Sequence, residues 1–194
     1  MHRLPLILMG RLFIIGIGGV TCGGKTTLTN KLRDLFPRSD MLFQDDFYWP
    51  DDSEHHTFDE YPDYVNYDML GAFDMDTMVQ KVHKLKREVE ELSESRFLLV
   101  EGILIFNHRD LSSLFDKKFF LTLPKEESFK RRKLREYLPP LPPDYDERVT
   151  WPMYLKHKKE ITNQRDIVYL DGTMLQEDVL QFVKKELVKL TEAV

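Results

Sequence analysis

Five short apolar runs alternate along the chain with longer segments in which apolar residues recur every three or four positions. The runs have the length and composition of buried strands, and they occupy residues 12–17, 40–44, 97–102, 119–123 and 167–170. Helical spacing covers residues 26–36, 67–73, 76–92, 125–137, 148–162 and 176–191, with Asp76 as an expected N-cap. This alternation predicts an α/β fold in three layers, a five-stranded parallel sheet flanked by helices.

Residues 49–66 follow neither pattern and are polar, which predicts a long loop of the kind that is often functional. The length of 194 residues and the 42% hydrophobic content suit one domain, placed at 11–194. Residues 1–10 are interpreted as a variable lead-in, because the first strand begins too soon after them for a cleaved signal peptide. No apolar run approaches the ~20 residues that a membrane span needs, so no membrane association is expected.

Between the first predicted strand and the first predicted helix lies a complete phosphate-binding loop, G-x-x-x-x-G-K-[ST]. Its backbone N–H groups would cradle the phosphates of a nucleotide, Lys25 would reach the β- and γ-phosphates, and Thr26 would hold Mg²⁺. A dinucleotide-binding turn is disfavoured because Thr21 stands where that motif needs a third glycine. The predicted ATP-binding residues of this segment are Gly19, Val20, Thr21, Cys22, Gly23, Gly24, Lys25, Thr26 and Thr27.

Two acidic residues end other predicted strands. Asp45 follows the second strand and Glu101 closes the third. Ligands of parallel sheets bind beyond the carboxyl ends of the strands, so both carboxylates are expected near Lys25. Glu101 is the expected second acid of the Mg²⁺ site, acting directly or through water.

A basic run at residues 130–135 precedes a proline-rich run at 138–143, between the fourth and fifth predicted strands. Arg131 and Arg135 are spaced i, i+4 and would share a helix face, with Arg132 beside them. We interpret residues 128–148 as a small lid whose cations clamp the transferring phosphoryl group.

From residue 39 to residue 80 the chain contains no lysine or arginine, but many acidic and aromatic residues. An acidic, aromatic wall repels anions and favours a neutral or cationic acceptor that stacks on aromatic faces. Asp45, Tyr48, Tyr67 and Asp68 lie at the ends of predicted elements, where a substrate could reach them.

The remaining features limit the function. A net charge of −5 argues against nucleic acid as a partner, and the single cysteine, Cys22, suits a reducing cytoplasm. His55-His56 has no partner at metal-ligand spacing, so we assign it to the loop. Asn163-Gln164-Arg165-Asp166 has glutamine where a guanine-reading motif needs lysine, which disfavours a GTPase.

Taken together, the motifs resemble the nicotinamide riboside kinases, in the nucleoside kinase branch of the P-loop proteins. The most specific matching segments are Gln-Asp-Asp-Phe-Tyr at 44–48 and Trp-Pro-Met-Tyr-Leu-Lys at 151–156. The others are residues 15–21, 24–27, 67–68, 100–102, 131–132, 135–137 and 169–173, and together they extend over residues 12–175.

The resemblance implies the roles of individual residues. Asp45 would be the base for the ribose 5′-hydroxyl, near Mg²⁺, so that Thr26, Asp45 and Glu101 form the metal site. Arg131 and Arg135 would face the ATP phosphates, and the loop after Gly172-Thr173 would border the adenine. The residues that would surround the riboside are Asp45, Asp46, Phe47, Tyr48, Tyr67, Asp68, Arg132 and Tyr137.

The predicted activity is the ATP-dependent phosphorylation of nicotinamide riboside, and of nicotinic acid riboside, to the mononucleotide in NAD biosynthesis. Mg²⁺ is the expected cofactor, and we expect a monomer or a weak homodimer. A uridine/cytidine-type kinase on the same scaffold is the alternative enzyme. A nucleotide-gated regulatory protein without turnover is the alternative of another class, although it would have no need of a base at Asp45.

Overall fold

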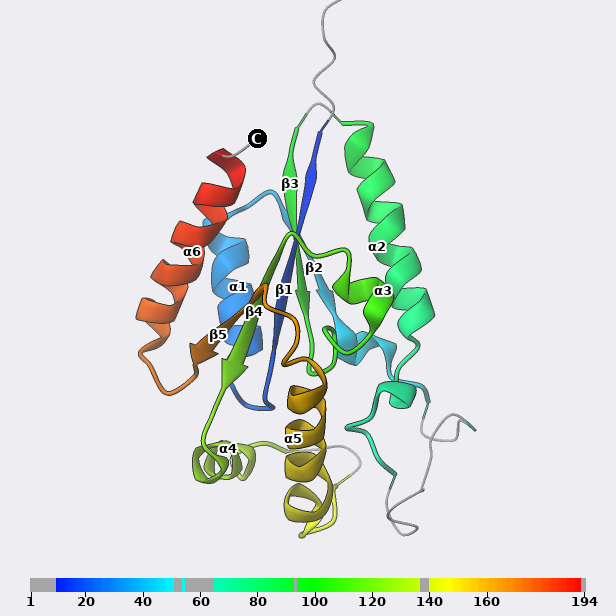
Figure 1. Cartoon of the computed structure of the whole chain (residues 1–194), viewed down its shortest axis with the longest axis vertical. Helices are drawn as coiled ribbons and strands as arrows, with labels where there is room; N and C mark the ends of the chain where they lie inside the picture. Colours follow the sequence, from blue (N-terminus) through cyan, green and yellow to red (C-terminus); the bar gives the residue numbers. More distant parts are fainter. Residues whose placement is uncertain (1–9, 51–53, 55–64, 93, 137–139, 193–194) are drawn as a thin grey trace, which may run out of the picture.

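The computed structural model describes residues 10–50, 54, 65–92, 94–136 and 140–192. At its centre is a five-stranded sheet in the order β2-β3-β1-β4-β5, and every neighbouring pair is parallel (Figure 1). The strands are β1 (Leu12–Gly19), β2 (Ser39–Phe43), β3 (Arg96–Glu101), β4 (Lys117–Thr122) and β5 (Ile167–Asp171). The predicted fold class is therefore confirmed, and each expected strand is present.

Helices cover both faces of the sheet in three layers, because the central strands are apolar on both sides. On one face lie α1 (Lys25–Leu35) and α6 (Gln176–Glu192), and on the other α2 (Met75–Glu90) and the short α3 (Arg109–Ser112). Each interface has its own apolar core. Leu32 and Val183 belong to the first, and Met78 and Phe106 to the second. No helix of the described residues is long and apolar enough to cross a membrane.

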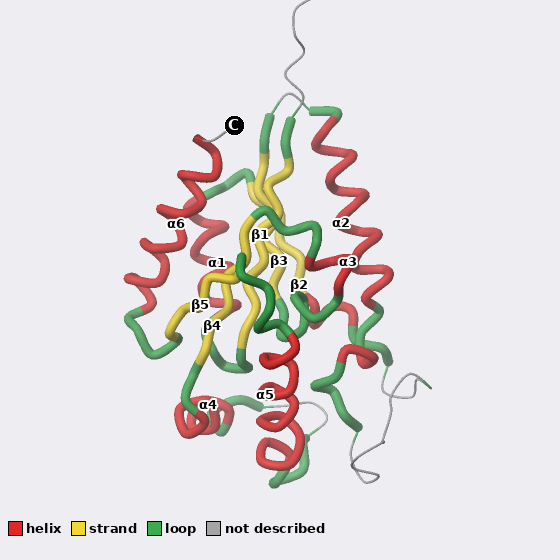
Figure 2. The backbone as a smooth tube through the Cα atoms, viewed as in Figure 1, coloured by secondary structure: helices red, strands yellow, loops and turns green. Residues whose placement is uncertain are grey.

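The remaining helices, α4 (Lys125–Arg132) and α5 (Trp151–Glu160), lie beyond the carboxyl ends of the strands (Figure 2). The strand register places the ends of β1, β2 and β3 at the same edge of the sheet, since Glu101 is level with Ile17 of β1 and with Phe43 of β2. The segments that leave β1 and β2 there are the phosphate loop and the turn that contains Asp45.

Three details of the sequence interpretation were wrong. No helix forms at 67–73, apart from a single 3₁₀ turn at Leu70–Ala72. Side chains occupy the backbone carbonyls that a helix would use, since the Tyr48 hydroxyl donates to the Tyr67 carbonyl and His157 Nε2 lies 3.0 Å from the Asp68 carbonyl. The N-cap of α2 lies two residues earlier than expected, because Asp74 rather than Asp76 caps the helix and accepts from Thr77 N–H.

The third error concerns the lid. Helix α4 ends at Arg132, after which successive N–H groups bond three residues back, so Arg131 and Arg135 do not share a helix face. A π turn over Asp146–Thr150 then precedes α5, where a continuous α-helix was expected from residue 148.

Candidate active site

The phosphate loop joins β1 to α1 and presents a bare helix N-terminus. Gly24 precedes the helix at φ 95°, a left-handed conformation that glycine adopts without strain, and its position carries no side-chain cap. Cys22 also has a positive φ, of 58°. The first turn of α1 contains no acidic residue. Unpaired N–H groups at the positive end of the helix dipole form an anion site.

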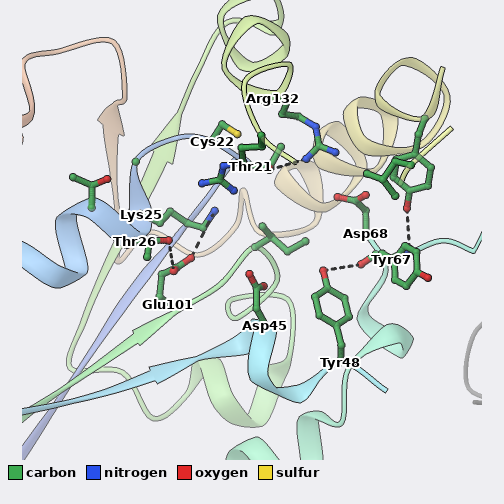
Figure 3. A pocket seen from close by; sticks show the side chains of 16 residues that line it. Thr21, Cys22, Lys25, Thr26, Asp45, Tyr48, Tyr67, Asp68, Glu101 and Arg132 are labelled. Atoms are coloured by element: carbon green, nitrogen blue, oxygen red, sulfur yellow. Dashed lines mark hydrogen bonds and ion pairs between the residues drawn. The ribbon is translucent and has the colours of Figure 1, made fainter. Parts of the chain in front are cut away.

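Lys25 and Thr26, the first residues of α1, both face Glu101 at the end of β3 (Figure 3). The Lys25 ammonium lies 3.8 Å from Glu101 Oε1 and donates to the Val20 carbonyl at 3.1 Å. The Thr26 hydroxyl donates to Glu101 Oε2 at 2.8 Å. The buried carboxylate of Glu101 thus contacts both a cation and the hydroxyl predicted to bind Mg²⁺.

Asp45 lies in a 3₁₀ turn over Gln44–Phe47, whose position is set by the buried side chain of Gln44. Gln44 Oε1 accepts from Leu104 N–H at 3.0 Å, which ties this turn to the loop after β3. A side chain at Gly102 would collide with Gln44, so glycine is required for this close approach. The result is an Asp45 carboxylate that lines the cavity facing the phosphate loop (Figure 3).

Three tyrosines form the aromatic side of the cavity: Tyr48, Tyr67 and Tyr145. The rings of Tyr48 and Tyr67 meet edge to face with centroids 6.0 Å apart, and the Tyr48 hydroxyl donates to the Tyr67 carbonyl at 3.3 Å. Burial raises the pKa of the Tyr48 hydroxyl well above its usual value, and the Asp45 and Asp68 carboxylates raise it further. Tyr48 therefore stays neutral at physiological pH.

Asp68 is held from two sides. The Thr150 hydroxyl donates to its Oδ2 at 3.1 Å, and His157 Nε2 lies 3.0 Å from its backbone carbonyl. Burial raises the pKa of the Asp68 carboxyl, while the Arg132 charge and the Thr150 hydrogen bond oppose this increase. Folding thus disfavours the ionised carboxylate, which indicates a position kept for a ligand rather than for stability.

The neighbouring arginines of α4 point to different places. Arg131 donates to the carbonyls of Cys22 and Gly172, at 3.3 and 3.2 Å, and so joins the phosphate loop to the end of β5. Arg132 is buried, donates to the Thr21 hydroxyl at 2.8 Å and pairs with Asp146 at 2.6 Å.

Two adjoining cavities meet at the phosphate loop and share Cys22, Gly24, Thr27 and Arg135. The larger, of about 400 Å³, holds Asp45, the tyrosines, Asp68 and Arg132, together with Thr21, Lys25, Thr26 and Glu101. The second, of about 290 Å³, is lined by Gly23, Arg131, Gly172 and Met174, among others. This size and division suit two small molecules whose reacting ends meet at the loop.

Some predicted site residues lie elsewhere. Phe47 is buried in the core and Asp46 is exposed, and neither lines the larger cavity. Gly19 and Val20 border a separate void of about 20 Å³ behind the loop. Tyr137 lies outside the described residues, as do residues 1–9 of the predicted lead-in.

The sequence interpretation missed several residues that the fold brings to the site. Tyr145, Ile103 and Leu141 line the larger cavity, while Gln44, Thr150, His157 and Asp146 hold its walls. Leu141, Tyr145, Asp146, Thr150 and His157 follow no periodic pattern, and only the long excursion between β4 and β5 signalled them in advance.

A parallel sheet with a phosphate loop, a carboxylate facing that loop and an aromatic acceptor cavity define a P-loop kinase of the nucleoside kinase type. No family model matches the chain. Individual relatives do. Nicotinamide riboside kinase 1 of Rattus norvegicus is 40% identical over 91% of this chain and 96% of its own length. Nicotinamide riboside kinase 1 of Homo sapiens is 37% identical, over 91% and 92%. The chain belongs to the nicotinamide riboside kinase family.

More distant similarities agree with this fold. Uridine kinase of Chlamydia pneumoniae is 31% identical over 67% of this chain and 66% of its own length. Among solved structures, thymidylate kinase from Candida albicans superposes with a TM-score of 0.56 at 17% identity, covering 95% of this chain and 93% of that one. That structural likeness supports the three-layer α/β architecture.

Proposed function

We propose that this protein transfers the γ-phosphoryl group of ATP to the 5′-hydroxyl of nicotinamide riboside, producing nicotinamide mononucleotide and ADP. The observation that carries the proposal is the acceptor side of the larger cavity, where carboxylates lie beside aromatic rings. Asp45 and Asp68 line it with Tyr48, Tyr67 and Tyr145, while Arg132 is already paired with Asp146. Such a cavity suits a cationic pyridinium ring, and the family of the relatives points to the same acceptor.

The described residues support a division of labour. The larger cavity would take the riboside, with the ribose at Asp68 and the ring among the tyrosines. The second cavity would take the nucleoside part of ATP between Arg131 and Met174. The phosphates would then lie over the α1 N-terminus, within reach of Lys25 and Arg135, where the two cavities meet.

In the reaction, the riboside 5′-oxygen forms a bond to the γ-phosphorus as the bond from that phosphorus to the β,γ-bridging oxygen breaks. Asp45 would accept the proton of the 5′-hydroxyl, and ADP would leave with the electron pair. Lys25 and Arg135 would stabilise the negative charge on the phosphoryl oxygens.

We also propose Mg²⁺ as the cofactor, held by Thr26, Asp45 and Glu101. Among the described residues no cluster of three or more His, Cys, Asp or Glu side chains could hold a metal by itself. This fits Mg²⁺, which in nucleotide sites is bound through one or two carboxylates, a hydroxyl, waters and the phosphates. The contact between Thr26 and Glu101 places the hydroxyl and one carboxylate together. When bound, Mg²⁺ would neutralise charge on the phosphates. We place the protein in the cytoplasm, a proposal that its single cysteine supports.

Nicotinamide riboside should be a better substrate than uridine, the acceptor of the alternative nucleoside kinase. A desolvated cation–π contact contributes ~2 kcal/mol, which corresponds to roughly thirtyfold in affinity. The test compares kcat/KM for both ribosides at fixed ATP and Mg²⁺. A uridine value equal to or above that of nicotinamide riboside would move the assignment to a uridine-type kinase, and no turnover of either would favour a regulatory protein.

Asp68→Asn should weaken riboside binding without destabilising the fold. Because folding raises the Asp68 pKa, the stability linked to this group is fully present below its ordinary pKa and is lost as the pH rises through the raised value. The neutral variant should therefore have a Tm at pH 7.5 equal to or above that of the wild type, and the difference should shrink at acidic pH. Its KM for riboside should rise about tenfold, since hydrogen bonds to charged groups are the stronger ones. An unchanged KM would remove Asp68 from the riboside site.

A further inference from the structure

A π turn over Asp146–Thr150 connects the wall of the larger cavity to the phosphate loop through its two end residues. At one end, Asp146 Oδ1 accepts from Arg132 Nε at 2.6 Å. Arg132 in turn donates to the Thr21 hydroxyl of the phosphate loop at 2.8 Å. At the other end, the buried Thr150 donates to Asp68 Oδ2 at 3.1 Å. Single π turns are rare and are frequent at functional sites.

The residues on both sides of this turn strengthen the connection to the acceptor cavity. Tyr145, directly before the turn, accepts from Tyr67 N–H at 2.9 Å and donates to the Val65 carbonyl at 3.2 Å. His157, on α5 after the turn, contacts the Asp68 carbonyl. The segment that precedes and follows the turn therefore holds residues 65–68 at three points, while Asp146 reaches the phosphate loop through Arg132.

We propose that Asp146 and Thr150 are positioning residues that make the binding of riboside and of nucleotide interdependent. This inference rests on the proposed function of the two cavities. Asp146 orients the guanidinium of Arg132 toward Thr21 of the phosphate loop, and Thr150 orients the carboxylate of Asp68. Both residues belong to one turn. Riboside binding at Asp68 therefore orders the turn and reduces the conformational entropy that nucleotide binding must still remove near Arg132. By thermodynamic linkage, nucleotide binding favours riboside binding by the same factor.

Charge supports the role of Asp146. Arg132 is nearly fully buried, at 6% exposure, and lies close enough to Asp68 to lower its pKa. Without Asp146 the guanidinium would turn toward the Asp68 carboxylate, on which its charge already acts, and would block the group that we expect to bind the ribose. Loss of Asp146 should therefore impair riboside binding, although Asp146 itself does not line the larger cavity.

The experiment measures the affinity for an ATP analogue with an imido group in place of the β,γ-bridging oxygen, with Mg²⁺, in the absence and presence of saturating nicotinamide riboside. In the wild type the riboside should increase this affinity about tenfold, within the usual range for coupled sites. Asp146→Ala should bring the factor close to one. Asp146→Asn should retain part of it, because its amide oxygen still accepts from Arg132 Nε.

Thr150→Val tests the other end, because it removes the hydroxyl at nearly constant shape. It should raise the KM for riboside about tenfold while changing kcat at saturation little, and Thr150→Ser should restore the KM. If the role of Thr150 were purely structural, Thr150→Val would instead lower the Tm and leave the KM for riboside equal to that of the wild type.

Glu147→Gln is the matched control, since Glu147 lies in the same turn but pairs with Lys125 at the surface. Its coupling factor should equal that of the wild type. The inference is overturned by a wild-type factor near one, by wild-type coupling in folded Asp146→Ala, or by an equal loss in Glu147→Gln. If uridine proves the better substrate, the proposed function fails and this inference does not, because the coupling is then measured with uridine, which carries the same ribose.

Discussion

Lys25→Ala is expected to lower kcat on the order of a thousandfold, the effect of removing a preorganised group that stabilises transition-state charge. The Lys25 ammonium lies at the start of α1, where the larger cavity meets the phosphate loop. It would contact the β- and γ-phosphates and act on both nucleotide binding and the reaction. Steady-state kinetics, with affinity for the imido analogue measured separately, should show both losses.

The tertiary structure changes how this variant must be controlled. Lys25 is only 7% exposed and is the cation next to the buried Glu101, so its removal leaves a buried carboxylate uncompensated. The double variant Lys25→Ala/Glu101→Gln removes that charge and should recover Tm but no activity. Arg33→Ala, on the exposed surface of the same helix, should retain wild-type kcat. A folded Lys25→Ala protein with full activity would exclude the phosphate-loop assignment.

Asp45→Asn is expected to lower kcat by ~10²–10⁴-fold, the usual contribution of a general base. The amide keeps the shape of the side chain but cannot accept the proton of the 5′-hydroxyl. Affinity for the ATP analogue should change little, because Asp45 lies across the cavity from the phosphate loop and the amide oxygen of asparagine can still face Mg²⁺. Rapid-quench measurement of the phosphoryl-transfer step would separate this loss from slow product release.

Asp46→Asn is the matched control for Asp45→Asn. The two residues are exposed neighbours in the same 3₁₀ turn, but only Asp45 lines the larger cavity. Near wild-type activity is therefore expected for Asp46→Asn. A crippled Asp46 variant together with a nearly silent Asp45 variant would mean that the base is the other member of the pair.

Much of the nucleotide side of the site could be predicted because its chemistry is local. The glycines, Lys25 and Thr26 are consecutive, and their function depends on backbone conformations that the sequence itself favours. Glu101 could also be placed, since an acidic residue that closes an apolar strand of a parallel sheet must lie at the ligand-binding edge. Aromatic and acidic residues around Tyr48 and Asp68 could be recognised as a wall, but not in their arrangement.

The acceptor side depends on contacts between segments far apart in the chain. Helical spacing at 67–73 gave a wrong prediction because Tyr48 and His157, from distant parts of the chain, occupy the backbone carbonyls of Tyr67 and Asp68. The two adjacent arginines of α4 point to different cavities because their partners, Gly172 for Arg131 and Asp146 for Arg132, come from different parts of the fold. No periodicity encodes such pairings, since each depends on where a turn or helix end falls in space.

The sequence by itself thus determined the class of fold, the phosphate loop and the edge of the sheet where the reaction takes place, because these follow from hydrophobic periodicity and backbone chemistry over a few residues. Only the tertiary structure decided that Asp46 does not line the larger cavity, that Phe47 belongs to the core, and that the turn at Asp146–Thr150 connects the wall of the larger cavity to the phosphate loop. Those outcomes are set by long-range packing and side-chain hydrogen bonds, which exist only when the whole chain is folded.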